Sequence, residues 1–266
     1  MKKGIIILCF LVVCKTSFSQ ITDTGLLSVI YQFKHMRDTS QRSYFYEEDM
    51  EMKIGKRIAL YHSLDYKQNR QKLEQAIMSN EGNNINLGNI NYRRGIPDEI
   101  YIVPLDKKMF TIKNFKGNKF NVVDSIAFIN WEITGQTKNI QGFLCQKAIG
   151  KYRGRIYGAW FTTDLPYPYG PWRLYGLPGL ILEATDTKGE VMFLCKEVKQ
   201  NSNSAIVFSN TISRTTPKEY NRMVDTYFND PSSMEGVQSV QLSTTSTSNP
   251  KAKKRTFNNP IELSKD

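Results

Sequence analysis

The stretch from Trp160 to Glu183, WFTTDLPYPYGPWRLYGLPGLILE, most constrains how this chain can fold. Its 24 residues hold four of the chain's ten prolines and two of its three tryptophans. Proline fixes φ near −65° and glycine tolerates positive φ, so the backbone follows a rigid path here. Leu177-Pro178-Gly179-Leu180 fits a type II turn, with proline and glycine in the central positions. The stretch therefore predicts a structural element, and it matches no familiar catalytic pattern.

Residues 176–181 spell GLPGLI, and they follow GPW at 170–172 and AWFTTDLP at 159–166. Together with CQKA at 145–148 and an NPIEL-like ending at 259–263, these motifs make the chain similar to the GLPGLI family. This resemblance implies a small secreted protein of Gram-negative bacteria, and the family has no assigned biochemical function. The signature residues are expected to be structural, with a binding surface as the alternative: Trp160, Asp164, Pro166, Gly170, Pro171, Trp172, Gly176, Leu177, Pro178, Gly179, Leu180 and Ile181.

The N-terminus is typical of a signal peptide. Lys2 and Lys3 precede an apolar run at 4–14, which is too short to span a bilayer. Ser17 and Ser19 supply small residues before a cleavage point, so residues 1–19 are expected to be removed. The residues before Cys14 lack the small side chain that a lipidation site needs. We therefore expect a periplasmic or extracellular protein, with association to the outer membrane as a further option.

The charge balance excludes few partners by itself. The net charge is +11 for the whole chain and about +8 after loss of the signal peptide. The basic residues are scattered rather than clustered on one periodic face, and export argues against nucleic acid as a partner. No later apolar run approaches the ~18 residues of a membrane helix, so no transmembrane segment is expected in the mature chain.

Short runs rich in apolar and β-branched residues, separated by turn residues, dominate the mature chain. Helical spacing appears only at 65–79 and from Pro217 to before Pro231, where Thr216 and Glu219 form a capping box. The pattern predicts a mainly β (α+β) fold, as a curved antiparallel meander or open half-barrel with about two packed helices. We expect one domain at 20–231 and a largely disordered polar and basic tail at 232–266. Strands are expected at 27–35, 44–54, 57–61, 99–103, 109–114, 119–123, 126–133, 142–149, 155–162, 180–185, 191–198 and 205–208.

The residues that usually carry chemistry are sparse. The chain has two histidines, His35 and His62, and no paired cysteines at metal-ligand spacing, nucleophile elbow or phosphate-binding loop. The sequence therefore predicts no catalytic, cofactor or metal site. After cleavage only Cys145 and Cys195 remain, and they form either a disulfide or two buried thiols.

These observations favour a non-enzymatic binding or scaffolding module whose partner is an envelope protein, a glycan or an apolar ligand. One alternative is a carrier that holds a lipid or other apolar ligand in the concavity of the curved sheet. A second alternative is a hydrolase that uses Asp164 with Glu183 or Asp186. The aromatic residues of the signature stretch either fill a core or form a binding platform.

Overall fold

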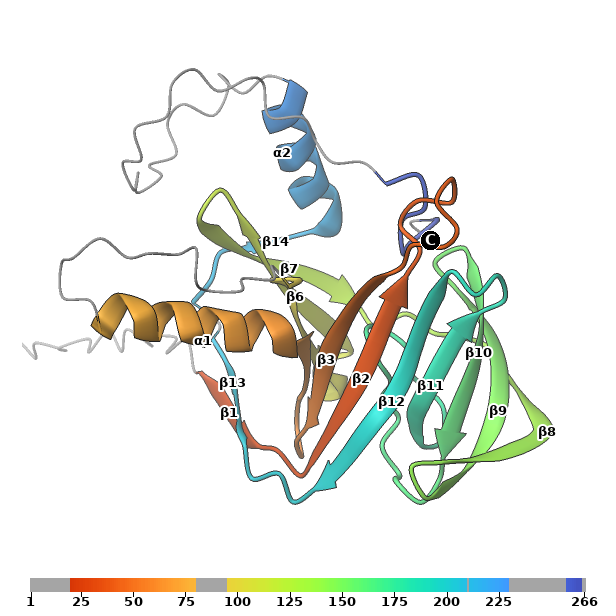
Figure 1. The fold of residues 1–266 in the computed structure, drawn as a ribbon. Coiled ribbons are helices and arrows are strands. Elements are labelled where there is room, and N and C mark those ends of the chain that lie inside the picture. The colour runs from red at the N-terminus through yellow and green to blue at the C-terminus, as the bar shows by residue number, and fades with distance from the viewer. Residues whose placement is uncertain (1–19, 80–94, 210, 230–256, 265–266) are drawn as a thin grey trace, which may run out of the picture.

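A computed structural model describes residues 20–79, 95–209, 211–229 and 257–264. Twelve of its strands form one sheet, which bends strongly and stays open rather than closing into a barrel (Figure 1). A two-stranded sheet and two α-helices complete the described part of the chain. The predicted mainly β class, with a curved antiparallel sheet and about two helices, is confirmed.

The bounds of most predicted strands agree with the structure to within a few residues. The clearest difference is the run at 126–133, where the strand begins only at Trp131 and continues to Ile140. The strands are β1 (Ile21–Thr24), β2 (Leu27–His35), β3 (Tyr46–Ile54), β4 (Ala59–Ser63), β5 (Glu99–Val103), β6 (Lys108–Phe115), β7 (Asn118–Ser125), β8 (Trp131–Ile140), β9 (Phe143–Tyr152), β10 (Arg155–Thr162), β11 (Leu180–Asp186), β12 (Val191–Gln200), β13 (Ala205–Phe208) and β14 (Arg214–Thr215). The helices are α1 (Leu64–Ser79), α2 (Pro217–Asn229) and the 3-10 turn η2 (Pro104–Asp106).

The large sheet joins two meanders. Its order is β14-β7-β6-β5-β4-β3-β2-β12-β11-β10-β9-β8, and all neighbours are antiparallel except β14 and β7. The two meanders meet where β2 pairs with β12 over nearly its whole length. Strands β8 to β12, on the right of Figure 1, and β2 to β6 share one core cluster, and Arg153 next to β10 lies 3.0 Å from Asp124 of β7, so the two parts of the sheet face each other across its concave side.

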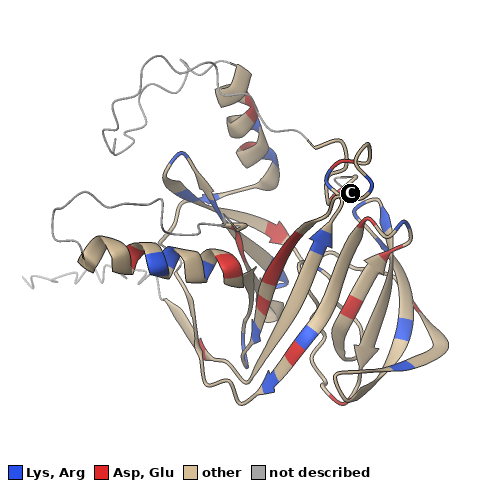
Figure 2. Cartoon of the chain, in the orientation of Figure 1, with Lys and Arg blue, Asp and Glu red and all other residues tan. Residues whose placement is uncertain are grey.

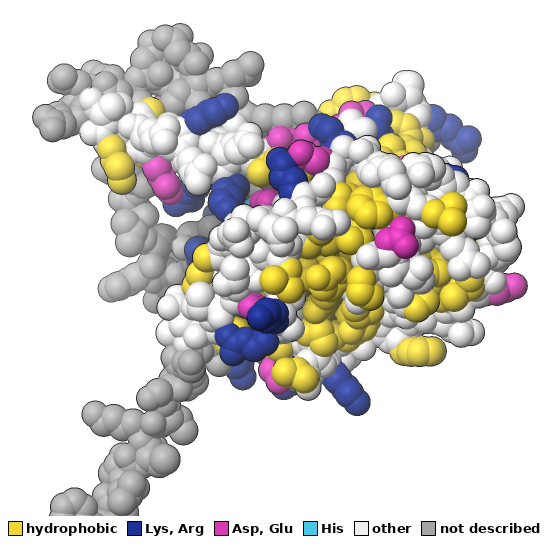
Figure 3. Space-filling model, turned by 90° about the horizontal axis from the view of Figure 1, so that it is seen from below, with side chains coloured by type: hydrophobic (Ala, Val, Ile, Leu, Met, Phe, Trp, Pro, Cys, Tyr) yellow, Lys and Arg dark blue, Asp and Glu magenta, His cyan; other side chains and the backbone are white. Residues whose placement is uncertain are grey.

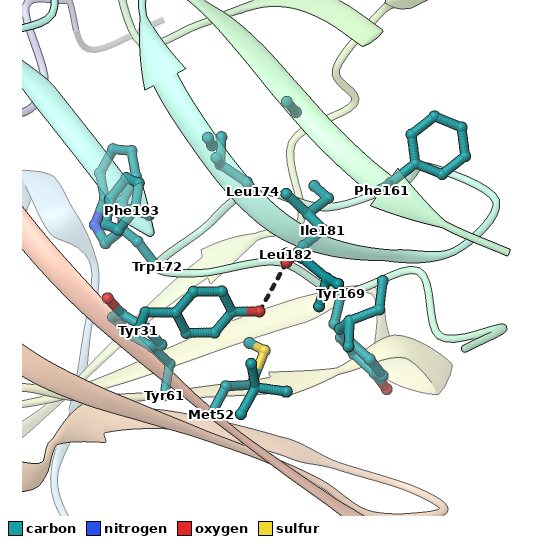
Figure 4. Packing of buried hydrophobic residues seen from close by; sticks show 14 of the residues in the cluster. Tyr31, Met52, Tyr61, Phe161, Tyr169, Trp172, Leu174, Ile181, Leu182 and Phe193 are labelled. Atoms are coloured by element: carbon teal, nitrogen blue, oxygen red, sulfur yellow. Dashed lines mark hydrogen bonds between the residues drawn. The ribbon is translucent and has the colours of Figure 1, made fainter. Parts of the chain in front are cut away.

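The signature stretch fills this concavity. Leu174, Leu177, Leu180 and Ile181 are at most 1% exposed and belong to the main core cluster (Figure 4). The Tyr31 hydroxyl donates to the Ile181 carbonyl at 2.7 Å, which ties the end of the stretch to β2. The burial of Leu177, Leu180 and Ile181 agrees with the structural role that was expected for the signature residues.

Both helices begin as the sequence predicts. In α2, Glu219 N donates to Thr216 Oγ1 at 3.2 Å and Thr216 N donates to Glu219 Oε2 at 2.9 Å, which is the expected capping box. The apolar stripe of α2 rests on β6 and β7 through ring contacts, such as Tyr220 against Phe120, yet none of its described side chains is buried. At α1, Ser63 Oγ accepts from Tyr66 N and caps the helix.

A short part of the tail that was expected to be largely disordered has a defined structure. Residues 230–256, like residues 80–94 and the predicted signal peptide at 1–19, lie outside the described residues. Residues 257–264, however, dock on the domain, and Asn259 is only 4% exposed. Its carbonyl lies 2.9 Å from His35 Nε2, and its side chain donates to Met36 O at 2.6 Å. The polar composition of the tail did not predict this docking, because the polar groups of Asn259 form hydrogen bonds with the protein rather than with water.

Gly179 is required for a different reason from the one the sequence suggests. A type II turn needs φ near +80° at its third residue, and Gly179 lies outside the positive-φ region, so that part of the prediction is wrong. Instead, a Cβ atom on Gly179 would lie 2.0 Å from the Thr162 carbonyl oxygen. The glycine lets the signature stretch approach the backbone at the end of β10.

We expect Gly179→Ala to destabilise the protein by about 3 kcal/mol, roughly 6–12 °C in melting temperature, because the clash is with backbone. Gly158→Ala on β10 is the control, since a Cβ there makes only ordinary contacts. Thermal unfolding followed by circular dichroism measures both. Equal melting temperatures for the two variants would show that the close approach at Thr162 does not matter.

We expect Asn259→Ala to cost about 2 kcal/mol, because it leaves the buried Met36 carbonyl and part of the Arg155 guanidinium without partners. Asn258→Ala next to it removes only exposed hydrogen bonds and should change stability by about 0.5 kcal/mol or less. Urea unfolding of the two variants provides the comparison. A fully native stability for Asn259→Ala would mean that the docked segment is dispensable.

Candidate functional site

A cavity of about 420 Å³ lies on the concave side of the sheet. The strands β2 to β6 and β12 form its floor, the signature stretch contributes one wall, and the docked C-terminal segment contributes another. Its lining is mostly apolar and aromatic, with charged side chains among the rest. The lining residues are Phe33, His35, Arg37, Met50, Tyr61, Ile96, Asp98, Ile100, Thr111, Lys113, Trp172, Arg173, Phe193, Phe257, Pro260, Ile261 and Glu262.

Three stacked aromatic rings, two from the floor and one from the signature stretch, line one side of the cavity. Trp172 lies parallel to Phe193 with ring centroids 6.4 Å apart, and Phe193 stacks on Phe33 at 5.2 Å. The backbone of Trp172 has φ of 59°, in the left-handed region that non-glycine residues rarely adopt. Such a conformation costs about 1–3 kcal/mol and persists only where the surroundings impose it. The strain therefore falls on the signature residue that lines the cavity.

Charged residues also line the cavity. Arg173 donates to Thr111 Oγ1 at 2.7 Å and also lies 3.3 Å from Asp124 Oδ2. Lys113 Nζ lies 2.9 Å from Asp98 Oδ2. The Arg173 contacts hold the signature stretch against β6 and β7. Arg37, the third cation of the lining, lies 3.4 Å from the centre of the Tyr46 ring.

The C-terminal wall is held by a buried arginine. The side chain of Arg155 is 1% exposed and contacts Asp186 at 2.6 Å and Glu190 at 3.0 Å. It also donates to Asn259 Oδ1 and to the carbonyls of Pro260 and Ile261. A buried guanidinium with this many acceptors fixes the end of the chain in one position.

Two ionisable residues at the floor keep their neutral forms. Burial lowers the pKa of His35 to about 4, and the nearby Arg37 and Arg155 charges act in the same direction. Burial also raises the pKa of Tyr61 well above its ordinary value, and the Glu48 carboxylate adds to the effect. His35 is therefore neutral at pH 7, and Tyr61 keeps its proton.

The signature residues lie in different environments: one lines the cavity, several are buried in the core, and the others are exposed or half-buried. Trp172 lines the cavity, whereas Gly170, Pro171, Leu177, Gly179, Leu180 and Ile181 are buried in the core. Asp164, Pro166, Gly176 and Pro178 are exposed. Trp160 is half-buried on the opposite side of β10, with Lys138 Nζ 4.6 Å from its ring centroid. The stretch is thus mainly a core element, and only a small part of it reaches a candidate site.

Asp164 and Asp186, one carboxylate pair of the hydrolase alternative, do not share a cleft. Asp186 on β11 lies opposite Tyr157 on β10, whereas Asp164 follows Thr162, at the other end of β10. Five residues of strand separate these ends by about 17 Å, beyond the ~5–9.5 Å between glycosidase carboxylates. Glu183 is engaged by Lys138. Within the described residues, no cluster of three or more histidine, cysteine, aspartate or glutamate side chains suits a metal ion.

Several residues of the cavity escaped the sequence reasoning. Arg155, Arg173 and Tyr61 come from separate strands and loops, and no spacing pattern connects them. The docked NPIEL-like ending was the one available signal, because a short motif beyond a polar tail indicates a specific contact.

Hydrophobic side chains also gather in the middle of the face seen from below (Figure 3). Lys and Arg are interspersed with Asp and Glu along the chain (Figure 2), as the scattered sequence pattern predicts.

Cys145 and Cys195 are free, buried thiols in the structure. Burial raises the pKa of Cys145 to about 11 and that of Cys195 to about 12. Because the thiolate is the reactive form, both should be inert in the folded protein.

For the protein without residues 1–19, which retains only Cys145 and Cys195, we expect no alkylation of the native form by iodoacetamide at pH 8 and two labels per molecule after denaturation without reductant. Intact-mass spectrometry counts the labels. The same experiment after reduction is the control, and it should also give two labels. A denatured, unreduced protein with no label would show that the two cysteines are bridged.

Comparisons with known proteins show the fold but not a family. No protein-family model matches the chain, and no curated protein matches it. The fold is similar to that of PNGF-II in its P21 crystal form, with a TM-score of 0.52 and 15% identity over 75% of this chain. The C2 form gives a TM-score of 0.51 and 15% identity over 77% of this chain. In both cases the match covers 33% of the PNGF-II chain, so this chain spans about a third of that length. Among the described helices, none has the length and apolar character needed to cross a membrane.

Proposed function

We propose that this chain is an exported, non-enzymatic binding protein that holds a small molecule with a largely apolar body in the concave cavity. The observation that carries the proposal is the cavity itself. Its volume of about 420 Å³ falls in the ~300–1,000 Å³ range of small-molecule sites. Its aromatic walls, with a few fixed polar groups among them, are also typical of such sites.

The construction of the walls supports binding rather than simple packing. The buried Arg155 fixes the C-terminal wall, and Trp172 of the opposite wall holds an unusual backbone conformation. A preformed site binds with less loss of conformational entropy than one that must be assembled. The carrier alternative therefore has more support than a hydrolase that uses Asp164 with Asp186, which lie at opposite ends of β10.

The location remains part of the proposal. It is supported by the signal-peptide pattern at 1–19 and by the resemblance to the GLPGLI family. A protein partner on the apolar area seen in Figure 3 is compatible with this function, because a carrier must receive or deliver its ligand.

The test is a fluorescence titration of the mature protein, residues 20–266, with anilinonaphthalene sulfonate as an apolar probe. We expect saturable binding of one probe per chain. Phe257→Ala should weaken binding about fivefold, because Phe257 is a half-exposed wall residue and its loss removes about 1 kcal/mol of apolar contact.

Phe128→Ala is the matched control. Phe128 is 91% exposed and is not part of the cavity wall, so this variant should bind the probe like wild type. Equal weakening by both substitutions, or no saturable binding at all, would contradict the proposed site.

A further inference from the structure

Three cations line the cavity, and two of them have carboxylate partners. Lys113 lies 2.9 Å from Asp98, and Arg173 lies 3.3 Å from Asp124. The third cation is Arg37, which is half-buried in the loop that follows β2. Among the described residues, no carboxylate oxygen lies within 4.0 Å of its guanidinium. Arg37 is therefore the cation of the lining that has no direct counter-charge.

The carboxylates closest to Arg37 in the chain and beside its aromatic contact have other partners. Asp38, the next residue, accepts a hydrogen bond from Asn258 Nδ2 at 2.7 Å. Glu48 is 2% exposed and accepts from the Tyr46 hydroxyl at 2.6 Å. A cation that is partly removed from water is stabilised by a counter-charge, and a cavity lined by such a cation attracts anions.

Aromatic rings hold the Arg37 guanidinium in place. Its Cζ atom lies 3.4 Å from the centroid of the Tyr46 ring and 5.1 Å from that of Phe257. The Arg37 carbonyl accepts from Asn259 N at 3.2 Å, so the docked C-terminal segment also fixes the backbone. Stacking uses the face of a guanidinium and leaves N–H donors at its edge, in the fork that matches a carboxylate. The guanidinium is therefore positioned before a ligand arrives.

The charged part of the cavity adjoins its aromatic part. Tyr46, under the guanidinium, contacts Phe33 edge to face with ring centroids 6.4 Å apart. Phe33 stacks on Phe193, and Phe193 stacks on Trp172. A ligand can therefore reach Arg37 with one end and these rings with its body.

The charge of the lining fits a ligand with one negative charge. The lining holds three cations and two carboxylates, namely Arg37, Lys113, Arg173, Asp98 and Glu262. Asp124, which also contacts Arg173, is shared with Arg153, a cation outside the lining. One positive charge therefore remains in the cavity, and a monoanion balances it.

We infer that the ligand of the proposed function is an amphipathic carboxylate, whose charged group pairs with Arg37 while its apolar body packs against Phe193 and Trp172. This inference rests on the proposed function, because it assumes that the cavity is the binding site. It adds the chemical class of the ligand, an ionised carboxylic acid, and the residue that recognises it.

The experiment uses two probes of nearly equal shape, 2-naphthoate and 2-naphthamide, which differ in a charged oxygen in place of an amide nitrogen. Isothermal titration calorimetry of residues 20–266 at pH 7 measures both affinities. We expect naphthoate to bind about tenfold more tightly than naphthamide, because only naphthoate forms a charge-assisted pair with Arg37.

Arg37→Gln should weaken naphthoate binding about tenfold and change naphthamide binding about twofold or less, because it removes the charge and keeps most of the side chain. Arg37→Lys keeps the charge without the planar fork, so it should retain about a threefold preference for naphthoate. Arg42→Gln is the matched control. It removes the same charge from an exposed position outside the lining, so it should bind both probes like wild type.

Equal affinity of wild type for the two probes would overturn the inference, as would an Arg37→Gln variant that keeps the preference for naphthoate or loses both probes alike. Each of these results leaves the proposed function standing if wild type binds naphthamide saturably and Phe257→Ala weakens that binding. Failure of naphthoate, naphthamide and anilinonaphthalene sulfonate to bind wild type would instead overturn the proposed function, and the inference with it.

Discussion

The structure depends on how a strongly bent sheet buries its concave face. A closed barrel fills its interior with side chains from its own strands, but this sheet stays open between β8 and β14. Instead, the segment between β10 and β11 folds into the concavity and covers the apolar side chains of the concave face. The prolines and glycines of that segment allow a path without regular secondary structure, and Leu174, Leu177 and Leu180 supply the apolar surface that the concave face needs.

The docked C-terminal segment forms another wall of the cavity, and the hydrogen bonds and ion pairs of Arg155 hold that segment in place. Arg155 stands at the start of β10, where it joins the β11–β12 turn to the docked C-terminal segment. Burying a guanidinium is costly unless nearly every donor finds an acceptor. Here the acceptors come from two carboxylates, one amide and two carbonyls. The end of the chain is therefore a built part of the cavity.

Local patterns predicted the fold well because strand alternation and helix caps act over a few residues. The capping box at Thr216 and the burial of Leu180 are examples. The cavity could not be predicted in the same way. Tyr61, Arg155 and Trp172 come from β4, β10 and the signature stretch, and only the curvature of the sheet brings these parts of the chain together. Gly179 shows a related limit, because its need for glycine comes from a backbone 17 residues earlier, at Thr162, rather than from its own turn.

Two departures from local preference fall at the same cavity. Trp172 adopts a backbone conformation that most aromatic residues avoid, and Tyr61 keeps a buried hydroxyl without a partner. Each lowers the stability of the folded chain, and phenylalanine at position 61 would remove one of these costs without changing the shape of the core. Sequences that are otherwise consistent with their fold concentrate such departures at functional sites. That both costs fall on residues of the cavity supports the proposal that the cavity is the functional site.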